Sequence, residues 1–138
     1  MGQYYKAIVL ESNGVTPKFG LDSWDYNSGS KLMEHSWIGN EFIQAFENLI
    51  YNNPQRVIWA GDYADPCKRR KSNLYDRIKD RHNVPRVDPL DTNNSRFIVN
   101  HTKGLFVDTA KLKPITAKWC QEEMVIHPLP LLTCEGNG

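Results

Sequence analysis

The amino-acid sequence predicts an α+β fold: one compact domain over residues 1–138, with a mixed or antiparallel sheet of about four to five strands and two helices. The length of 138 residues is typical of one domain. Hydrophobic residues make up 40% and charged residues 24% of the chain, which is the composition of a globular protein rather than a disordered one. The short β-branched runs do not alternate regularly with helical segments, so a parallel βαβ sheet is not expected.

The first half of the sheet is predicted from three segments. The run from Tyr4 to Leu10 is aromatic and β-branched and is followed by a Ser-Asn-Gly turn sequence, which predicts a strand. Residues 11–31 are rich in Gly, Ser, Asn and Asp and indicate a long polar loop with a short strand around Phe19–Trp24. The brief apolar run Arg56–Ala60 predicts a buried strand.

The clearest helix is predicted from Ser36 to Tyr51, because its apolar side chains recur at helical spacing on one face. Either Ser36 or Asn40 can cap its start, and an Asn-Asn-Pro sequence follows its end. A second helix, on the surface, is predicted from Ser72 to Arg81, and its apolar stripe consists of Leu74, Tyr75 and Ile78.

The second half of the chain predicts a hairpin and one further strand. Arg96–Asn100 and Leu105–Asp108 flank a Thr-Lys-Gly turn, which is typical of a β-hairpin. Met124–His127 is the last predicted strand. The two prolines that follow, Pro128 and Pro130, keep the next residues out of a sheet interior.

Composition also indicates where the protein works. No apolar run approaches the roughly 20 residues of a membrane helix, and the N-terminus lacks a secretory signal pattern. The three cysteines, Cys67, Cys120 and Cys134, are odd in number and far apart, as is typical of reduced thiols in a cytoplasmic protein. The net charge of +1 gives no overall attraction to nucleic acid. We therefore expect a cytoplasmic location, and neither a membrane nor a nucleic acid as partner.

The first candidate site comprises Glu34, His35, Ser36 and Trp37, at the predicted start of the long helix. Backbone N–H groups at a helix N-terminus, beside a hydroxyl and an imidazole, favour anion binding. The alternative interpretation is a helix cap with a partly buried histidine.

The second candidate site follows the strand that ends in Gly-Asp. Asp62 and Asp65 lie there with Trp59 and Tyr63 on either side, so carboxylates and aromatic rings would meet at a sheet edge. The carboxylates could bind a metal, act as a base, or accept hydrogen bonds from a sugar or base edge. The alternative is a turn that uses Gly and Asp for its backbone conformation.

Two further groups complete the candidates. The basic stretch from Lys68 to Arg86 includes Arg69 and Arg70, whose guanidinium groups suit phosphate, although most charge runs are solvated surface. His101 and His127 lie at predicted strand ends, with Asn100 beside the first, and could act as acid or base. No zinc-ligand spacing and no cofactor-binding motif occurs, so no cofactor is expected.

Five strings span the chain from end to end: MGQYYK at residues 1–6, KLMEHS at 31–36, VIWAGDYAD at 57–65, FIVNHT at 97–102 and IHPLPLLT at 126–133. Together they resemble a family of small, mostly uncharacterised bacteriophage and prophage proteins. The resemblance carries no enzyme name. Its phage setting implies a role against host defence in the host cytoplasm, as played by proteins that sequester or cleave nucleotide immune signals.

The favoured interpretation is a protein that binds a small phosphate-bearing nucleotide and so sequesters a host immune signal, with two copies able to form one pocket. Aromatic rings would stack on the base, carboxylates would hold the ribose or base edge, and arginines the phosphate. The alternative is a hydrolase of such a nucleotide, in which His35, His101 or His127 transfers protons and Asp62 orients one of them or holds a divalent metal. A third function is an inhibitor that binds a host protein through the Arg-rich helix or the tail Leu129–Leu132, although we expect that tail to belong to the core.

Overall fold

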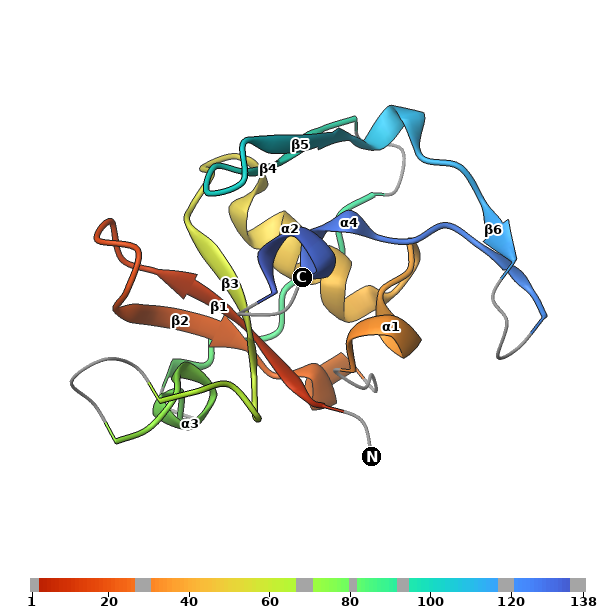
Figure 1. The fold of residues 1–138 in the computed structure, drawn as a ribbon. Helices are drawn as coiled ribbons and strands as arrows, with labels where there is room; N and C mark the ends of the chain where they lie inside the picture. Colours follow the sequence, from red (N-terminus) through yellow and green to blue (C-terminus); the bar gives the residue numbers. More distant parts are fainter. Residues whose placement is uncertain are drawn as a thin grey trace.

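A computed structural model of the chain describes residues 3–26, 31–66, 71–79, 82–91, 95–116 and 121–134. Its centre is a three-stranded antiparallel sheet in the order β2-β1-β3, formed by β1 (Tyr5–Leu10), β2 (Pro17–Leu21) and β3 (Val57–Gly61) (Figure 1). The three predicted strands therefore exist, and β2 begins two residues before the predicted segment and ends three residues earlier.

The central strand has two buried faces because side chains alternate along it. Tyr5, Ala7 and Val9 join the larger core, whereas Ile8 and Leu10 join a second cluster on the opposite face. A strand buried on both faces reads as a nearly continuous apolar run, which is the pattern of its sequence.

Helix α2 (Glu41–Tyr51) covers the larger core face, where Phe42 and Phe46 pack against Trp59 of β3. The helix does not begin at Ser36, the first of its two predicted caps, but the second predicted cap, Asn40, is confirmed. Asn40 is the cap, because its side-chain oxygen accepts a hydrogen bond from the Ile43 N–H at 3.2 Å. The preceding residue, Gly39, has a φ of +104°, a conformation that no helix can contain.

The second face of the sheet carries the short helix α3 (Leu74–Arg77), which is one turn long rather than the predicted ten residues. The predicted stripe is nevertheless correct, since Leu74 and Ile78 are buried against Ile8 and Ala60 and Tyr75 packs on the same cluster. Ile78 ends the helix because its backbone is extended. Residues 80–81 of the predicted helix lie outside the described residues.

The hairpin prediction is confirmed by β4 (Phe97–Asn100) and β5 (Leu105–Asp108), which pair antiparallel. Gly104 closes their turn with a φ of +64°, a left-handed conformation that favours glycine. A further pair consists of β6 (Ile115–Thr116), which was not predicted, and β7 (Glu123–Met124). Strand β7 shares only Met124 with the predicted strand Met124–His127, so the rest of that prediction is wrong.

Four short helical segments connect these elements: α1 (Leu32–His35), α4 (Pro128–Thr133), and the 3₁₀ turns η1 (Ser23–Tyr26) and η3 (Thr109–Lys111). None was predicted. Helix α4 buries Leu129 and packs Leu132 on the core, so the expected core role of that tail is confirmed for these two residues.

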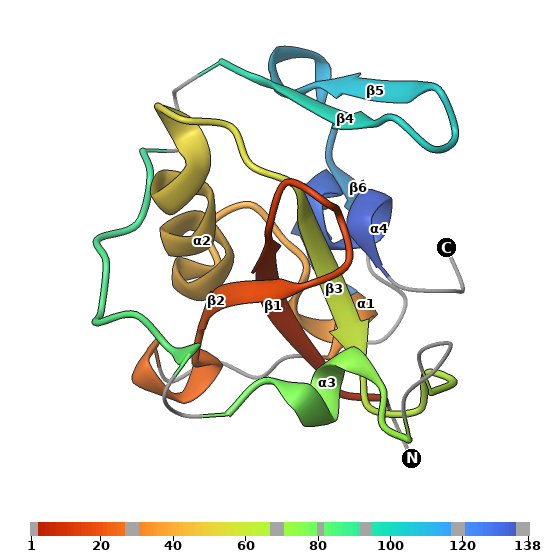
Figure 2. The same ribbon diagram turned by 90° about the vertical axis from the view of Figure 1, so that its left-hand side faces the viewer.

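The fold is thus α+β, as predicted, but the strands form three small antiparallel sheets instead of one. In both views the β4–β5 hairpin lies at one end of the molecule and α3 at the other (Figures 1 and 2). Among the described residues, no helix has the length and apolar character needed to span a bilayer.

Candidate functional site

The four predicted catalytic residues do not meet in one pocket. His101 is exposed in the β4–β5 turn, and Asp62 follows β3. His35 lies in α1, where its Nδ1 accepts a hydrogen bond from the Lys31 N–H at 3.1 Å. His127 is fully buried at the start of α4. None of the four lines either of the two hollows described below.

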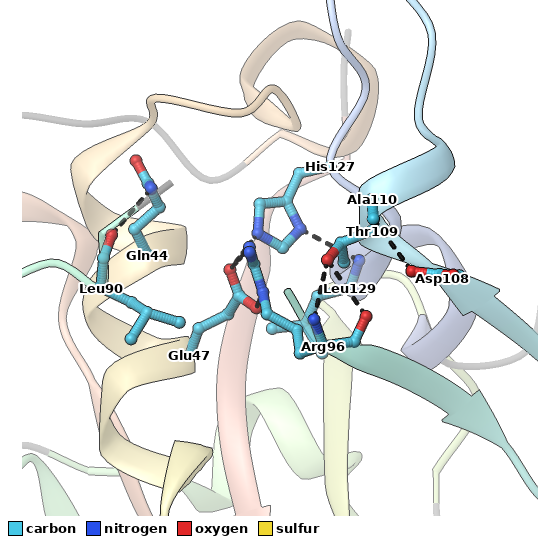
Figure 3. Close-up of polar contacts among 9 residues, drawn as sticks. All are labelled: Gln44, Glu47, Leu90, Arg96, Asp108, Thr109, Ala110, His127 and Leu129. Atoms are coloured by element: carbon cyan, nitrogen blue, oxygen red, sulfur yellow. Dashed lines mark hydrogen bonds and ion pairs between the residues drawn. The ribbon is translucent and has the colours of Figure 1, made fainter. Parts of the chain in front are cut away.

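His127 belongs to a buried charge cluster with Glu47 of α2 and Arg96 beside β4 (Figure 3). Arg96 donates two hydrogen bonds to the Glu47 carboxylate, from Nε and from Nη2, each at 2.5 Å. His127 Nε2 lies 2.5 Å from the same carboxylate. The side chains of Glu47, Arg96 and His127 are only 5%, 9% and 0% exposed, so the cluster is shielded from water.

The hydrogen bonds define the tautomer of His127. Its Nδ1 accepts the Leu129 N–H at 3.2 Å as the cap of α4, so the proton is on Nε2 and points at Glu47. Burial raises the pKa of Glu47, but hydrogen bonds from His127 and Arg96, together with the positive charge of Arg96, outweigh burial and hold that pKa below its usual value. Both ring nitrogens of His127 therefore make hydrogen bonds within the protein. The cluster connects α2 with α4 and with the start of β4, and its role is structural.

Further hydrogen bonds stabilise the region around the cluster. Thr109 of η3 donates from its hydroxyl to the Arg96 carbonyl at 3.1 Å and accepts from the Arg96 N–H at 3.0 Å (Figure 3). The Gln44 side chain donates to the Leu90 carbonyl at 2.9 Å. Sequence reasoning missed Glu47 and Arg96. A glutamate on the apolar side of a predicted helix is the signal that could have found the first.

Four other residues that were predicted to bind a ligand are instead buried or hydrogen-bonded within the fold. Ser36 and Trp59 are each 2% exposed, so neither side chain can reach a ligand. Asp62 accepts the Tyr4 N–H at 3.1 Å and ties the end of β3 to the start of β1. Asn100 donates to the Leu132 carbonyl at 2.8 Å.

Tyr63 and Asp65 of the second candidate site do not line a described hollow either. Tyr63 and Asp65 are exposed beyond the end of β3. Arg69, Arg70, Cys67 and Cys120 lie outside the described residues, whereas Cys134 is a free thiol.

Glu34 and Trp37 do come together, in a hollow of about 680 Å³ beside β7. Glu122 and Glu123 line the same hollow, which therefore carries three carboxylates. Like charges repel, so this acidic hollow does not suit the phosphate of a nucleotide. The anion site predicted at Glu34–Ser36 also lacks its helix, because α1 ends at His35 and α2 begins at Glu41.

A second hollow, of about 240 Å³, lies at the edge of β1, and we call it the β1-edge groove. It forms because β2 stops opposite Ala7, which leaves the edge of Tyr5 and Lys6 without a strand on that side. The 3₁₀ turn η1 and helix α3 border the gap. These segments and the residues next to them contribute Asp22, Trp24, Tyr75 and Lys79.

The groove combines an exposed aromatic ring with two positive charges. Trp24 is 76% exposed at its rim, and its N–H donates to Asp22 Oδ1 at 3.0 Å, which fixes the turn. Lys6 Nζ donates to the Tyr75 and Ile78 carbonyls at 2.9 and 3.3 Å and lies 4.1 Å from the centre of the Tyr75 ring. Lys79 is exposed.

The phenol of Tyr75 is held in its protonated form. Burial raises its pKa, and the nearby carboxylates of Asp62, Asp76 and Asp22 raise it further. A neutral Tyr75 keeps its hydroxyl proton for donation. Lys79 belongs to the basic stretch that was a candidate site from the sequence, whereas Lys6, Asp22 and Trp24 were not singled out. The signals were a Trp inside a polar loop and a Lys in the middle of an apolar strand.

No protein-family profile, curated protein or solved structure matches this chain. Over the described residues, no group of three or more His, Cys, Asp or Glu side chains is arranged to hold a metal ion. The site has to be judged on its own geometry.

Proposed function

We propose that this protein binds a small phosphate-bearing nucleotide in the β1-edge groove. The observation that carries the proposal is the largely exposed Trp24 at the rim of a hollow that also contains Lys6 and Lys79. An indole in water is a stacking surface for a base, and lysines provide the charge for phosphate.

Each part of a nucleotide has a counterpart in the groove. A base can stack on Trp24, while Asp22 can accept hydrogen bonds from ribose hydroxyls. Lys79 is free to turn toward a phosphate because its side chain is exposed. Lys6 is held in place by two carbonyls and contributes a fixed positive charge at the base of the groove.

The size of the groove limits the ligand. Its volume of about 240 Å³ is slightly below the roughly 300–1,000 Å³ of pockets for drug-sized ligands. One nucleoside unit with its phosphate therefore fits better than a whole cyclic dinucleotide. A larger nucleotide would leave its remainder outside the groove.

The predicted histidine-dependent hydrolase is disfavoured because no histidine lines the groove. Both ring nitrogens of His127 are engaged in the buried cluster, and His101 lies in the hairpin at the far end of the molecule (Figure 1). A hydrolase needs a base within hydrogen-bonding reach of its reacting atoms. The resemblance to phage proteins supports capture of a host nucleotide signal as the biological role.

Titration calorimetry tests the proposal with AMP, ADP, ADP-ribose and a cyclic dinucleotide. We expect binding of at least one of the first three in the micromolar range, and loss of most of that affinity in Trp24→Ala. Tyr63→Ala is the matched control, because Tyr63 is 64% exposed but lies outside the groove. Absence of binding across the whole panel would overturn the proposal. Chromatography of the recovered ligand should show it intact.

A further inference from the structure

Two uncharged polar side chains line the β1-edge groove, Ser23 of η1 and Asn83 in the segment after α3. Within the ranges that the structure describes, neither the Ser23 hydroxyl nor the Asn83 side-chain amide makes a hydrogen bond. Ser23 is only 9% exposed, and a buried polar group without a partner costs free energy. The groove therefore contains hydrogen-bonding groups that a ligand can satisfy.

Backbone contacts hold both residues beside the end of β2. Asn83 forms a parallel bridge with Gly20 of β2, where the N–H of the next residue donates to the Gly20 carbonyl at 2.9 Å. Ser23 lies in the turn that the Trp24 N–H closes by donating to Asp22 Oδ1. Groups that are fixed in this way lose little conformational freedom when they bind a ligand.

The surroundings of these two residues suit a nucleobase better than a phosphate. Two charged groups of the groove are already engaged, since Lys6 donates to two carbonyls and Asp22 Oδ1 accepts the Trp24 N–H. Three buried apolar residues also line the groove: Ala7, Leu21 and Phe42. A base is the part of a nucleotide that combines apolar faces with an uncharged hydrogen-bonding edge, and its stacking partner Trp24 directly follows Ser23.

We infer that Asn83 and Ser23 recognise the edge of an adenine base, so that the groove selects adenine nucleotides; this inference rests on the proposed nucleotide function. The Asn83 amide accepts from the N6 amine and donates to N7, which is the bidentate pairing that asparagine makes with adenine. The Ser23 hydroxyl both donates and accepts, so it can bond to N1 or to the second N6 hydrogen.

The other purine matches these groups less well. Guanine carries two acceptors, O6 and N7, along the edge where adenine has one donor and one acceptor, so the amide oxygen of Asn83 has no hydrogen to accept there. The opposite edge of guanine carries two adjacent donors, which suit a carboxylate, but Asp22 already uses one oxygen within its turn. A pyrimidine covers less of the Trp24 indole than a purine does.

Calorimetry with AMP and IMP tests the inference, because IMP has the same sugar and phosphate but a carbonyl oxygen in place of the N6 amine. The wild type should bind AMP at least about fivefold more tightly than IMP. Asn83→Leu, of similar size, should reduce this AMP-to-IMP ratio to about one. Asn53→Leu is the matched control, because Asn53 is exposed and lies outside the groove, and it should keep the wild-type ratio.

Ser23→Ala separates a binding role from a structural one. Because the hydroxyl has no hydrogen bond within the described residues, its removal should not lower the urea midpoint of the ligand-free protein. The same change should weaken AMP binding by roughly 2- to 10-fold. A lower midpoint with unchanged AMP affinity would show that the hydroxyl serves folding and would overturn its assignment.

The outcomes distinguish this inference from the proposed function. Equal binding of AMP and IMP by the wild type, or a wild-type ratio in Asn83→Leu, would overturn adenine recognition and leave the nucleotide site in place. Binding of neither nucleotide would overturn both. 7-Deaza-AMP, which lacks only the N7 acceptor, should bind the wild type more weakly than AMP does, and equal affinity would contradict the assigned edge.

Discussion

The protein has two polar regions that resemble each other in composition and differ in solvent access. The Glu47–Arg96–His127 cluster and the β1-edge groove each combine a carboxylate with a positively charged side chain. In the cluster every side chain is at least nine-tenths buried, and the single carboxylate is bonded from both sides. In the groove, Trp24 and Lys79 face solvent.

This difference separates stabilising polar groups from binding groups. The cluster has no donor or acceptor on His127 left for a ligand, and its charges neutralise each other inside the fold. The groove keeps an aromatic surface and a lysine side chain available to a ligand. A histidine at the end of a strand is therefore a poor guide to function unless its exposure is known.

Replacing Glu47 should produce the largest effect. Glu47→Gln keeps the shape of the side chain but removes the negative charge to which the buried Arg96 guanidinium donates two hydrogen bonds. Breaking a buried ion pair on one side typically costs about 3–5 kcal/mol, so we expect a fall of that size in the free energy of unfolding measured in urea.

Glu41→Gln on the same helix is the matched control. Glu41 lies 3.7 Å from Arg86, but both side chains are more than half exposed, so the pair adds no more than about 1 kcal/mol. Equal losses in the two variants would contradict a special role for the buried cluster.

Acid should lower the free energy of unfolding for the same reason as Glu47→Gln, because protonation removes the negative charge of Glu47. The pKa of Glu47 is lower in the folded protein than its usual value of 4.5, so its contribution to stability is fully present above pH 4.5. That contribution is lost as the pH falls through the lower, folded-state value. Urea unfolding at several pH values should show the wild type losing stability in this window by more than Glu47→Gln does. Parallel curves for the two proteins would show that Glu47 is not the titrating group.

Replacing Trp24 should affect binding but not folding. Stacking of one base on an aromatic ring is worth about 1–3 kcal/mol, which corresponds to a roughly 5- to 150-fold weaker affinity in Trp24→Ala. Because Trp24 is 76% exposed, its loss should change the free energy of unfolding by less than about 0.5 kcal/mol. A strongly destabilised variant with unchanged affinity would reverse the assignment of this region.

The smallest effect is expected at His101. It is exposed in the hairpin turn and lines neither hollow, so His101→Ala should leave both stability and nucleotide affinity within experimental error of the wild type. Loss of binding in this variant would indicate that the nucleotide site is in the hairpin and would contradict its assignment to the β1-edge groove.

Much of the fold could be predicted from local sequence. The aromatic and β-branched run Tyr4–Leu10, the glycine of the β4–β5 turn and the stripe around Leu74 each predicted an element that exists. The helix start was missed because Ser36 and Asn40 are equally good caps by type, and only the conformation of Gly39 decides between them. Single-turn helices such as α1 have too few residues to show a period.

The site was harder to predict because it depends on contacts distant in sequence. Glu47, Arg96 and His127 come from three separate elements, and no spacing rule joins them. The groove exists only because β2 stops opposite Ala7, a property of strand pairing rather than of any motif. The sequence correctly indicated polar residues at the ends of strands and helices. Most of these residues are buried or hydrogen-bonded within the fold, so their role is structural.

The most direct test of the central claim is calorimetry of the wild type, Trp24→Ala, Lys79→Ala and Tyr63→Ala with ADP-ribose and AMP. We expect micromolar binding by the wild type and Tyr63→Ala, and clearly weaker binding by the two groove variants. Equal affinity in all four proteins, or binding lost only in Tyr63→Ala, would contradict the groove as the nucleotide site.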